Sequence, residues 1–334
     1  IKVTTMEQMF HKTGFMSMTV LNLGSKFNTS SVINMNSMFR ETGNQAMTSL
    51  NLGSLFYTSK VTDMKNMFNA CGYGAMTTIN LGSNFNTSSV TNMNSMFFNC
   101  GYMAMTSLDL GTLFDTSNVT NMNSMFDNCG YTSMTTLNLG SKFNTSKVTD
   151  MEWMFTRCGY ESMTSLDLGS LFYTSNVTIM RGMFQSCGYG SMTKLDLGAN
   201  FDTSNVTDMF GMFHKCGFKQ MTYLTLGNKF NTSNVTNMEG MFVDCGLEKL
   251  TSLSLGKSFY TNKVTTMENM FYQCGQYSLQ SLDLGPAFTK IADINTNMFY
   301  DTGKLGAVIY APESIYKNRT SFKKSSTDTS TAAG

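Results

Sequence analysis

The chain has little charge, little histidine and no long hydrophobic run. Only 13% of its 334 residues are charged, and the net charge is +1. Binding to phosphate backbones depends on clustered Lys and Arg, so a nucleic acid is not expected as a partner. No apolar run approaches the roughly 20 residues that cross a bilayer, and the first six residues lack a signal peptide's apolar segment. We therefore expect any targeting or anchoring segment to lie outside this sequence.

Catalytic groups are also scarce. The two histidines, His11 and His214, lie 203 positions apart (214 − 11), and each follows the Met-Phe pair of a repeat. No partner motif for nucleophilic or acid–base chemistry accompanies either one. We expect both histidines to be exposed surface residues, and we predict that the protein is not an enzyme and needs no cofactor.

What the chain does have is a strict internal repeat. Its hydrophobic content of 41% is enough for a large folded core. A fixed period of this kind decides the fold class before any other pattern. The period is 29, and it is clearest in one glycine per unit: Gly24, Gly53, Gly82, Gly111, Gly140, Gly169, Gly198, Gly227, Gly256 and Gly285.

Each unit reads M-T-S-L-x-L-G-x-x-F-x-T-S-x-V-T-x-M-x-x-M-F-x-x-C-G-Y. Leu108 and Leu110 alternate with polar residues, which is typical of a strand. The later part spaces its apolar residues by three and four, which is typical of a helix: Val119, Met122, Met125, Phe126 and Cys129. Thr149 with Glu152 matches a helix capping box, and the glycine after the cysteine suits the position that follows a helix.

These elements must stack to bury their apolar faces. Parallel strands lie roughly 4.8 Å apart, whereas packed helices need about 8 to 10 Å between their axes. The helical side would therefore fan out. The pattern predicts an α/β solenoid, a curved stack of about ten 29-residue strand-plus-short-helix turns with its strands on the concave face.

Both ends depart from the repeat. We assign residues 1–303 to the solenoid, with an incomplete first unit, because Val3 and Met6 already stand in the helix register. Residues 304–323 are predicted to form a C-terminal cap containing a strand that ends at Pro312, since an exposed last turn needs covering. Residues 324–334 read as a flexible Ser/Thr-rich tail. The incomplete start indicates either a fragment or an end that docks onto another subunit.

The unit resembles the BspA-type leucine-rich repeats of bacterial surface proteins. The resemblance rests on Leu166-Asp167-Leu168-Gly169, Phe172, Thr174-Ser175-Asn176-Val177-Thr178, Met180, Met183-Phe184 and Cys187. It extends from about Val3 to Phe299, although a Gly stands where that family often has Ser, and the insert between units is longer. It implies a leucine-rich-repeat-like fold in a secreted or surface-anchored protein, with adhesion as the usual assignment and no catalytic residues.

The cysteines recur once per turn at one register position. An even number in an extracellular chain normally suggests disulfides. Adjacent helices at 8 to 10 Å, however, exceed the roughly 4.4 to 6.8 Å between α-carbons that a disulfide tolerates. We predict buried free thiols, with pairing of neighbours as the alternative, for Cys71, Cys100, Cys129, Cys158, Cys187, Cys216, Cys245 and Cys274.

The 31 methionines share the helical spacing, so we expect them in the core as flexible fillers and not as ligands for copper(I). No metal is predicted. The aspartates of the strand row are not spaced like a calcium loop either.

Binding is predicted on the outward strand positions. Most of this row is monotonous, but Lys194 and Tyr223 interrupt it beside Asp196, and such a break is where specificity could lie. The candidate binding residues on the concave strand face are Asp109, Asp167, Lys194, Asp196, Tyr223 and Asp283.

Three functions remain open on the sequence alone. The first is an extracellular adhesion module that binds a protein or glycan on a host or neighbouring cell. The second is a structural spacer, or a fibre in which copies of the chain join end to end. The third is ice binding by the Thr-Ser ladder, in which Thr29-Ser30 is the first pair, although Ser and Thr at turns usually satisfy local backbone groups.

Overall fold

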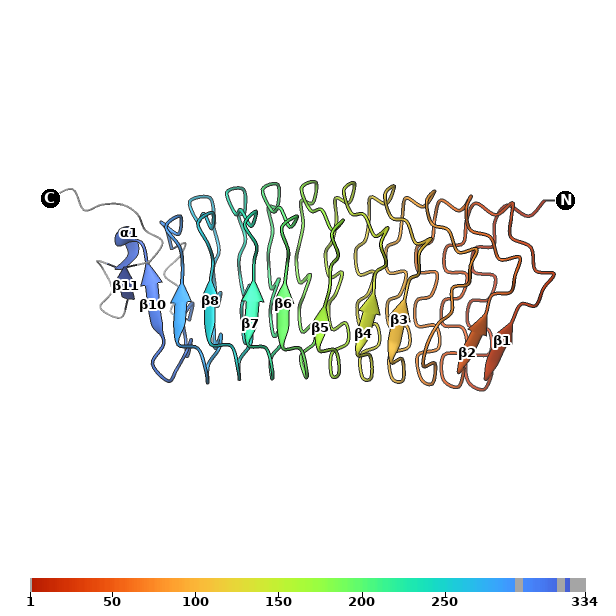
Figure 1. The fold of residues 1–334 in the computed structure, drawn as a ribbon, viewed down its shortest axis with the longest axis horizontal. Helices are drawn as coiled ribbons and strands as arrows, with labels where there is room; N and C mark the ends of the chain where they lie inside the picture. The colour runs from red at the N-terminus through yellow and green to blue at the C-terminus, as the bar shows by residue number, and fades with distance from the viewer. Residues whose placement is uncertain (1, 292–296, 317–321, 325–334) are drawn as a thin grey trace.

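The computed structural model describes residues 2–291, 297–316 and 322–324. The chain winds into a β-solenoid of about ten turns, and each turn is one 29-residue unit. In Figure 1 the turns stand side by side along the long axis, with the first turns at one end and the last turns at the other. The predicted solenoid is confirmed, but its predicted helices are not.

The L-x-L segments form one parallel stack of short strands. The strands pair within four separate sheets, at a register of one full unit, so that Leu108 faces Leu137. The leucine in each of β2 to β9 is buried and its polar neighbours point outward. In the turn that contains Asn80 the pairing is reduced to a single bridge with Asn51. The strands are β1 (Val20–Asn22), β2 (Ser49–Asn51), β3 (Ser107–Asp109), β4 (Thr136–Asn138), β5 (Ser165–Leu166), β6 (Lys194–Asp196), β7 (Tyr223–Thr225), β8 (Ser252–Ser254) and β9 (Ser281–Asp283).

The segment predicted as a helix is instead a run of tandem turns. Within residues 122–129, the amides of Met122, Ser124 and Phe126 donate to carbonyls of the next turn at 2.9–3.1 Å. The amides between them bond locally: that of Met125 donates to the Met122 carbonyl three residues back at 3.2 Å, and that of Asn123 donates to the Asn121 side chain at 3.0 Å. Ser124 and Asn128 have φ of +55° and +56°, which an α-helix does not allow. The three-and-four spacing of apolar residues is thus produced by turns that project the same side chains inward.

The capping boxes do not form either. The Thr149 hydroxyl donates to the Thr120 carbonyl of the preceding turn at 3.3 Å, and the Glu152 amide bonds to the Asp150 carboxylate at 2.9 Å. Within the described residues the only α-helix is α1 (Glu313–Tyr316), close to the C-terminus.

The predicted curvature is wrong for the same reason. A second series of parallel bridges runs from Thr5 to Thr266 on the side where helices were expected. Phe126 stacks on the equivalent rings of the neighbouring turns, Phe97 and Phe155, with centroids 5.7 and 5.5 Å apart. Because backbone bridges join successive turns on this side from Thr5 to Thr266, it does not fan out, and Figure 1 shows no horseshoe bend.

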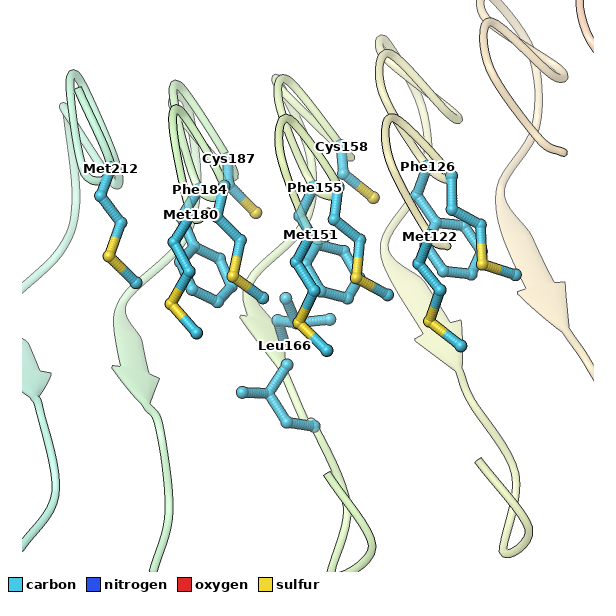
Figure 2. Close-up of a cluster of buried hydrophobic side chains, with 14 of the residues drawn as sticks. Met122, Phe126, Met151, Phe155, Cys158, Leu166, Met180, Phe184, Cys187 and Met212 are labelled. Carbon is cyan, nitrogen blue, oxygen red and sulfur yellow. The ribbon is translucent and has the colours of Figure 1, made fainter. Parts of the chain in front are cut away.

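The core consists of rows of identical side chains. Figure 2 shows Met122, Met151 and Met180 in one row beside Phe126, Phe155 and Phe184 in another, all with side chains pointing inward. These residues are 0% exposed. Aromatic pairs of this kind contribute about 0.5–1.5 kcal/mol each beyond the area that they bury. A repeated row of such contacts makes each turn stabilise the next.

A buried row of threonines adds hydrogen bonds between turns. Thr116 is 0% exposed, and its hydroxyl donates to the Asn144 carbonyl of the next turn at 2.8 Å. The same bond forms from Thr29 through Thr232. The threonine of the Thr-Ser pair therefore faces the core and presents no hydroxyl ladder to ice.

After the last repeat the sheet continues. The expected strand is present as β10 (Val308–Ala311), which pairs in parallel with β9 and with β11 (Phe322–Lys324). Phe299 still stacks on Phe271 at 5.4 Å although one residue is missing from this unit. The predicted cap and tail lie partly outside the described residues, at 317–321 and from residue 325 onward.

Candidate functional site

The outward Asn/Asp row of the strand face has a structural role in most turns. The Asp167 carboxylate accepts a hydrogen bond from the Gly169 amide at 2.9 Å, and Asp196 does the same with Gly198. Equivalent bonds involve Asn22, Asn51, Asn80, Asp109, Asn138 and Asp283. This is an Asx turn, in which the side chain fixes the backbone two residues ahead. The row therefore shapes the corner where each strand ends.

The structure brings some of the predicted strand-face residues together. Asp167, Lys194 and Asp196 line one open groove of about 380 Å³. Tyr223, 54% exposed, is the registered neighbour of Lys194 and lines a second groove of about 300 Å³. Asp109 and Asp283 belong to β3 and β9, away from this group.

All eight cysteines are free and 0% exposed. Burial raises the pKa of the Cys71, Cys129, Cys216 and Cys274 thiols to about 12. The argument from helix spacing was wrong, because the Gly101 amide bonds to the Cys71 carbonyl at 3.1 Å and the turns here have β spacing. Burial keeps these thiols neutral and out of reach of solvent.

The largest differences between turns lie outside the strand face. They occur at the outward positions of the tandem turns, on either side of the Met-Phe pair. Some turns carry small polar residues before the pair, such as Asn123-Ser124, and the early turns already include Arg40, Lys65 and Phe98 at these positions. From Glu152 onward nearly every turn carries a large or charged residue there, and we call this part of the surface the variable face: Glu152, Trp153, Arg181, Phe210, His214, Glu239, Val243, Glu268 and Tyr272.

Arg181 organises one part of the variable face. Its guanidinium lies 2.8 Å from the Asp208 carboxylate and 3.3 Å from that of Glu152. The same group stands 4.6 Å from the centre of the Phe210 ring, within the range of a cation–π contact. Arg181 thus fixes Phe210 and Glu152 with respect to each other across three turns.

Trp153, the only tryptophan in the chain, lies over a glycine of the next turn. A Cβ added at Gly182, the equivalent position one unit later, would overlap the Trp153 ring. Other turns place Ser124 and Asn269 at this position with φ near +55°, so the backbone there does not require glycine. Gly182 is needed because the ring occupies the space that a side chain would take.

Two further glycines follow at the same position, and no ring covers them. A Cβ at Gly211 would lie 3.6 Å from the Gln185 Oε1 atom, and one at Gly240 would lie 3.5 Å from Val243, both ordinary contacts. The space that they leave is a hollow of about 330 Å³. Around these glycines it is lined by Phe210, His214, Glu239, Val243, Asn269 and Tyr272, and we call it the Gly211–Gly240 hollow.

The hollow has a neutral histidine and an acidic flank. Burial, and secondarily Lys215, lowers the pKa of His214 to about 4, so His214 is uncharged at neutral pH. Both His214 and His11 are half-buried, and the expectation that they would be exposed is wrong. In the part of the chain that the structure describes, Glu239 forms no ion pair.

Sequence reasoning missed this surface because it assigned the segment to a helix. The signal was available in Gly182, Gly211 and Gly240, three glycines one unit apart in the middle of an expected helix, where glycine is unfavourable by about 1 kcal/mol. At the positions of Asn123-Ser124, later turns instead carry the aromatic residues Trp153 and Phe210.

Within the described ranges, no group of three or more His, Cys, Asp or Glu residues is arranged to hold a metal ion. In the same part of the chain, no helix has the length and apolar content needed to cross a membrane.

Comparison with known proteins finds one family. The model described as "Mycoplasma protein of unknown function, DUF285" matches four overlapping stretches, residues 1–103, 43–165, 102–216 and 189–310. No curated protein matches, and no solved structure matches.

Proposed function

The chain belongs to the DUF285 family, and on that premise we propose that it is a non-catalytic binding module of the cell surface. Its rigid solenoid would present the variable face to a protein on a host or neighbouring cell. One observation carries this proposal. The core rows repeat with little change, whereas the outward residues from Glu152 to Tyr272 differ from turn to turn. Side chains that contact only solvent do not need to differ between turns, so we take this variation as a sign of a partner.

Two further features support the proposal. The surface is polar and nearly uncharged, which limits non-specific attraction to nucleic acid or acidic lipid. The resemblance to BspA-type repeats supports an extracellular location, and the strand-face groove at Asp167, Lys194 and Asp196 is a second candidate contact surface.

A binding array of matrix proteins, cell-surface proteins and glycans tests the proposal. One double variant, Phe210→Asn with Tyr272→Asn, alters the variable face. Asparagine is already found at these two register positions in other turns, as Asn94 and Asn69. The matched control, Lys194→Ser with Tyr223→Ser, alters the strand face. We expect the first variant to lose binding and the second to retain it. The reverse result would assign binding to the strand face, and no binding by the unaltered chain would contradict the proposal.

The second candidate is a structural spacer or end-to-end fibre, favoured by the uniform core rows. Light scattering over a range of concentrations separates the two. A constant monomer mass supports the binding module, whereas a mass that grows with concentration supports the fibre.

A further inference from the structure

We propose that the Gly211–Gly240 hollow binds an aromatic side chain of a partner protein. The aromatic ring would lie over Gly240 as Trp153 lies over Gly182, and the partner would carry a positively charged group beside the ring. The inference rests on the proposed binding function and adds to it a site and the chemistry of its ligand.

The chain itself contains the model for such a contact. Trp153 stands at one register position and covers the glycine at that position in the next turn. Gly211 and Gly240 repeat the arrangement one and two turns later, but position 211 carries no ring to cover Gly240. Neither glycine is required by a clash, since a Cβ would meet only ordinary contacts at both. Their absent side chains leave space that nothing in the described chain uses.

The walls of the hollow suit a flat apolar group. Phe210 and Tyr272 bound it along the stack, and Val243 provides an aliphatic surface beside Gly240. The Phe210 ring is engaged by Arg181, and Tyr272 stacks on Tyr300 with centroids 5.1 Å apart. Both rings are therefore held in place before a ligand arrives. A volume of about 330 Å³ is at the low end of ligand pockets, which favours one ring system over a larger molecule.

The charge of the hollow selects for a cation beside the ring. Glu239 lines it, and Glu268 occupies the same register position one turn later. The nearby cation Arg181 is engaged by Glu152 and Asp208, and Lys215 lies 3.9 Å from Asp244. Neutral His214 adds no positive charge. A basic group next to the aromatic ring would thus be attracted, and an acidic one repelled.

The test uses 5-fluorotryptamine, an indole with an ammonium group, added to the full chain and followed by fluorine NMR line broadening. We expect binding to the unaltered protein and at least about tenfold weaker binding of 5-fluoroindole-3-acetate, which carries the opposite charge. Glu239→Gln should reduce binding of the amine and leave that of neutral 5-fluoroindole unchanged.

Gly211→Trp is the decisive variant, because the new ring would cover Gly240 as Trp153 covers Gly182. It should reduce tryptamine binding by at least about tenfold. Ser95→Trp is the control: it adds a tryptophan at the same register position, also with positive φ, four turns away, where Ser124 and not a glycine follows one turn later. This control should bind like the unaltered chain, and circular dichroism and thermal midpoints should show that both variants fold.

Equal loss in both variants, no loss in Gly211→Trp, or no binding to the unaltered chain would overturn the proposal. A dimer in light scattering that Gly211→Trp abolishes would assign the hollow to a second copy of the chain and overturn it as well. If tryptamine binds as expected but the array finds no surface partner, the site stands and the proposed function fails.

Discussion

Asp127 gives the sharpest prediction about stability. Asp127 follows the Met-Phe pair of its turn, the residue is 8% exposed, and its Oδ1 atom has no hydrogen-bond partner in the part of the chain that the structure describes. Burial raises the pKa of this carboxyl from 3.8 to about 7, although Arg157 acts in the opposite direction. Asp127 is therefore protonated in the folded protein at pH values where it is ionised in the unfolded chain.

The sign of the pH dependence follows from this difference. Between about pH 4 and pH 7 Asp127 holds more protons in the folded state than in the unfolded state, so its contribution to stability falls as the pH rises. A pKa difference of about three units corresponds to about 4 kcal/mol, at 1.36 kcal/mol per unit. Asp127→Asn removes the titration. We expect this variant to match the unaltered protein near pH 4 and to exceed its stability by up to about 4 kcal/mol near pH 8.

Urea unfolding followed by circular dichroism, over about pH 4 to pH 8, measures the effect. The control is Asp63→Asn, which places an amide where Asn34 and Asn92 already form the equivalent turn in other units. It should not show the gain in stability near pH 8 that Asp127→Asn shows. Parallel pH profiles for Asp127→Asn and the unaltered protein would refute the reasoning.

Three further predictions concern the stack. Thr116→Val removes the buried hydroxyl that donates to the Asn144 carbonyl and should lower the free energy of unfolding in urea by about 1–3 kcal/mol. Thr178→Val, at an exposed threonine, should lower it by less than about 0.5 kcal/mol. Thiol titration should detect no reactive cysteine in the folded chain and all eight in denaturant, and stability should fall above about pH 8.5, where unfolded thiols ionise and buried ones do not. Gly182→Ser should displace Trp153 and shift its fluorescence to longer wavelengths, whereas Gly211→Ser should not.

The repeat itself was predictable, and so was the inward position of its apolar residues. A 29-residue register in Leu, Val, Met, Phe and Cys requires the same side chains to recur in every turn. Leu108 lies in a strand as its alternation indicated, and it pairs with Leu137 in the expected parallel register.

The tandem turns were not predictable from apolar spacing alone. Met122, Met125, Phe126 and Cys129 point inward whether the backbone forms a helix or turns with φ of +55° at Ser124. The spacing records which side chains share a face, and it does not record whether an amide bonds within its own turn or to the next one. Where every other amide bonds to the next turn, spacing between turns contracts from that of helices to that of strands.

The candidate site could not be predicted for a related reason. The Gly211–Gly240 hollow depends on contacts between residues 29 positions apart, such as Trp153 over Gly182, and these follow only once the turns have β spacing. If the turns were helices 8 to 10 Å apart, the same glycines would only destabilise their own helices and would form no shared hollow.

The distance between turns on this side of the solenoid is therefore the most direct test. Asn94→Cys with Glu268→Cys places two spin labels at one register position, six turns apart (268 − 94 = 6 × 29), while the eight native thiols stay buried. Stacking at β spacing predicts a separation of about 29 Å by double electron–electron resonance. A separation of about 48–60 Å, as packed helices would give, would contradict the account.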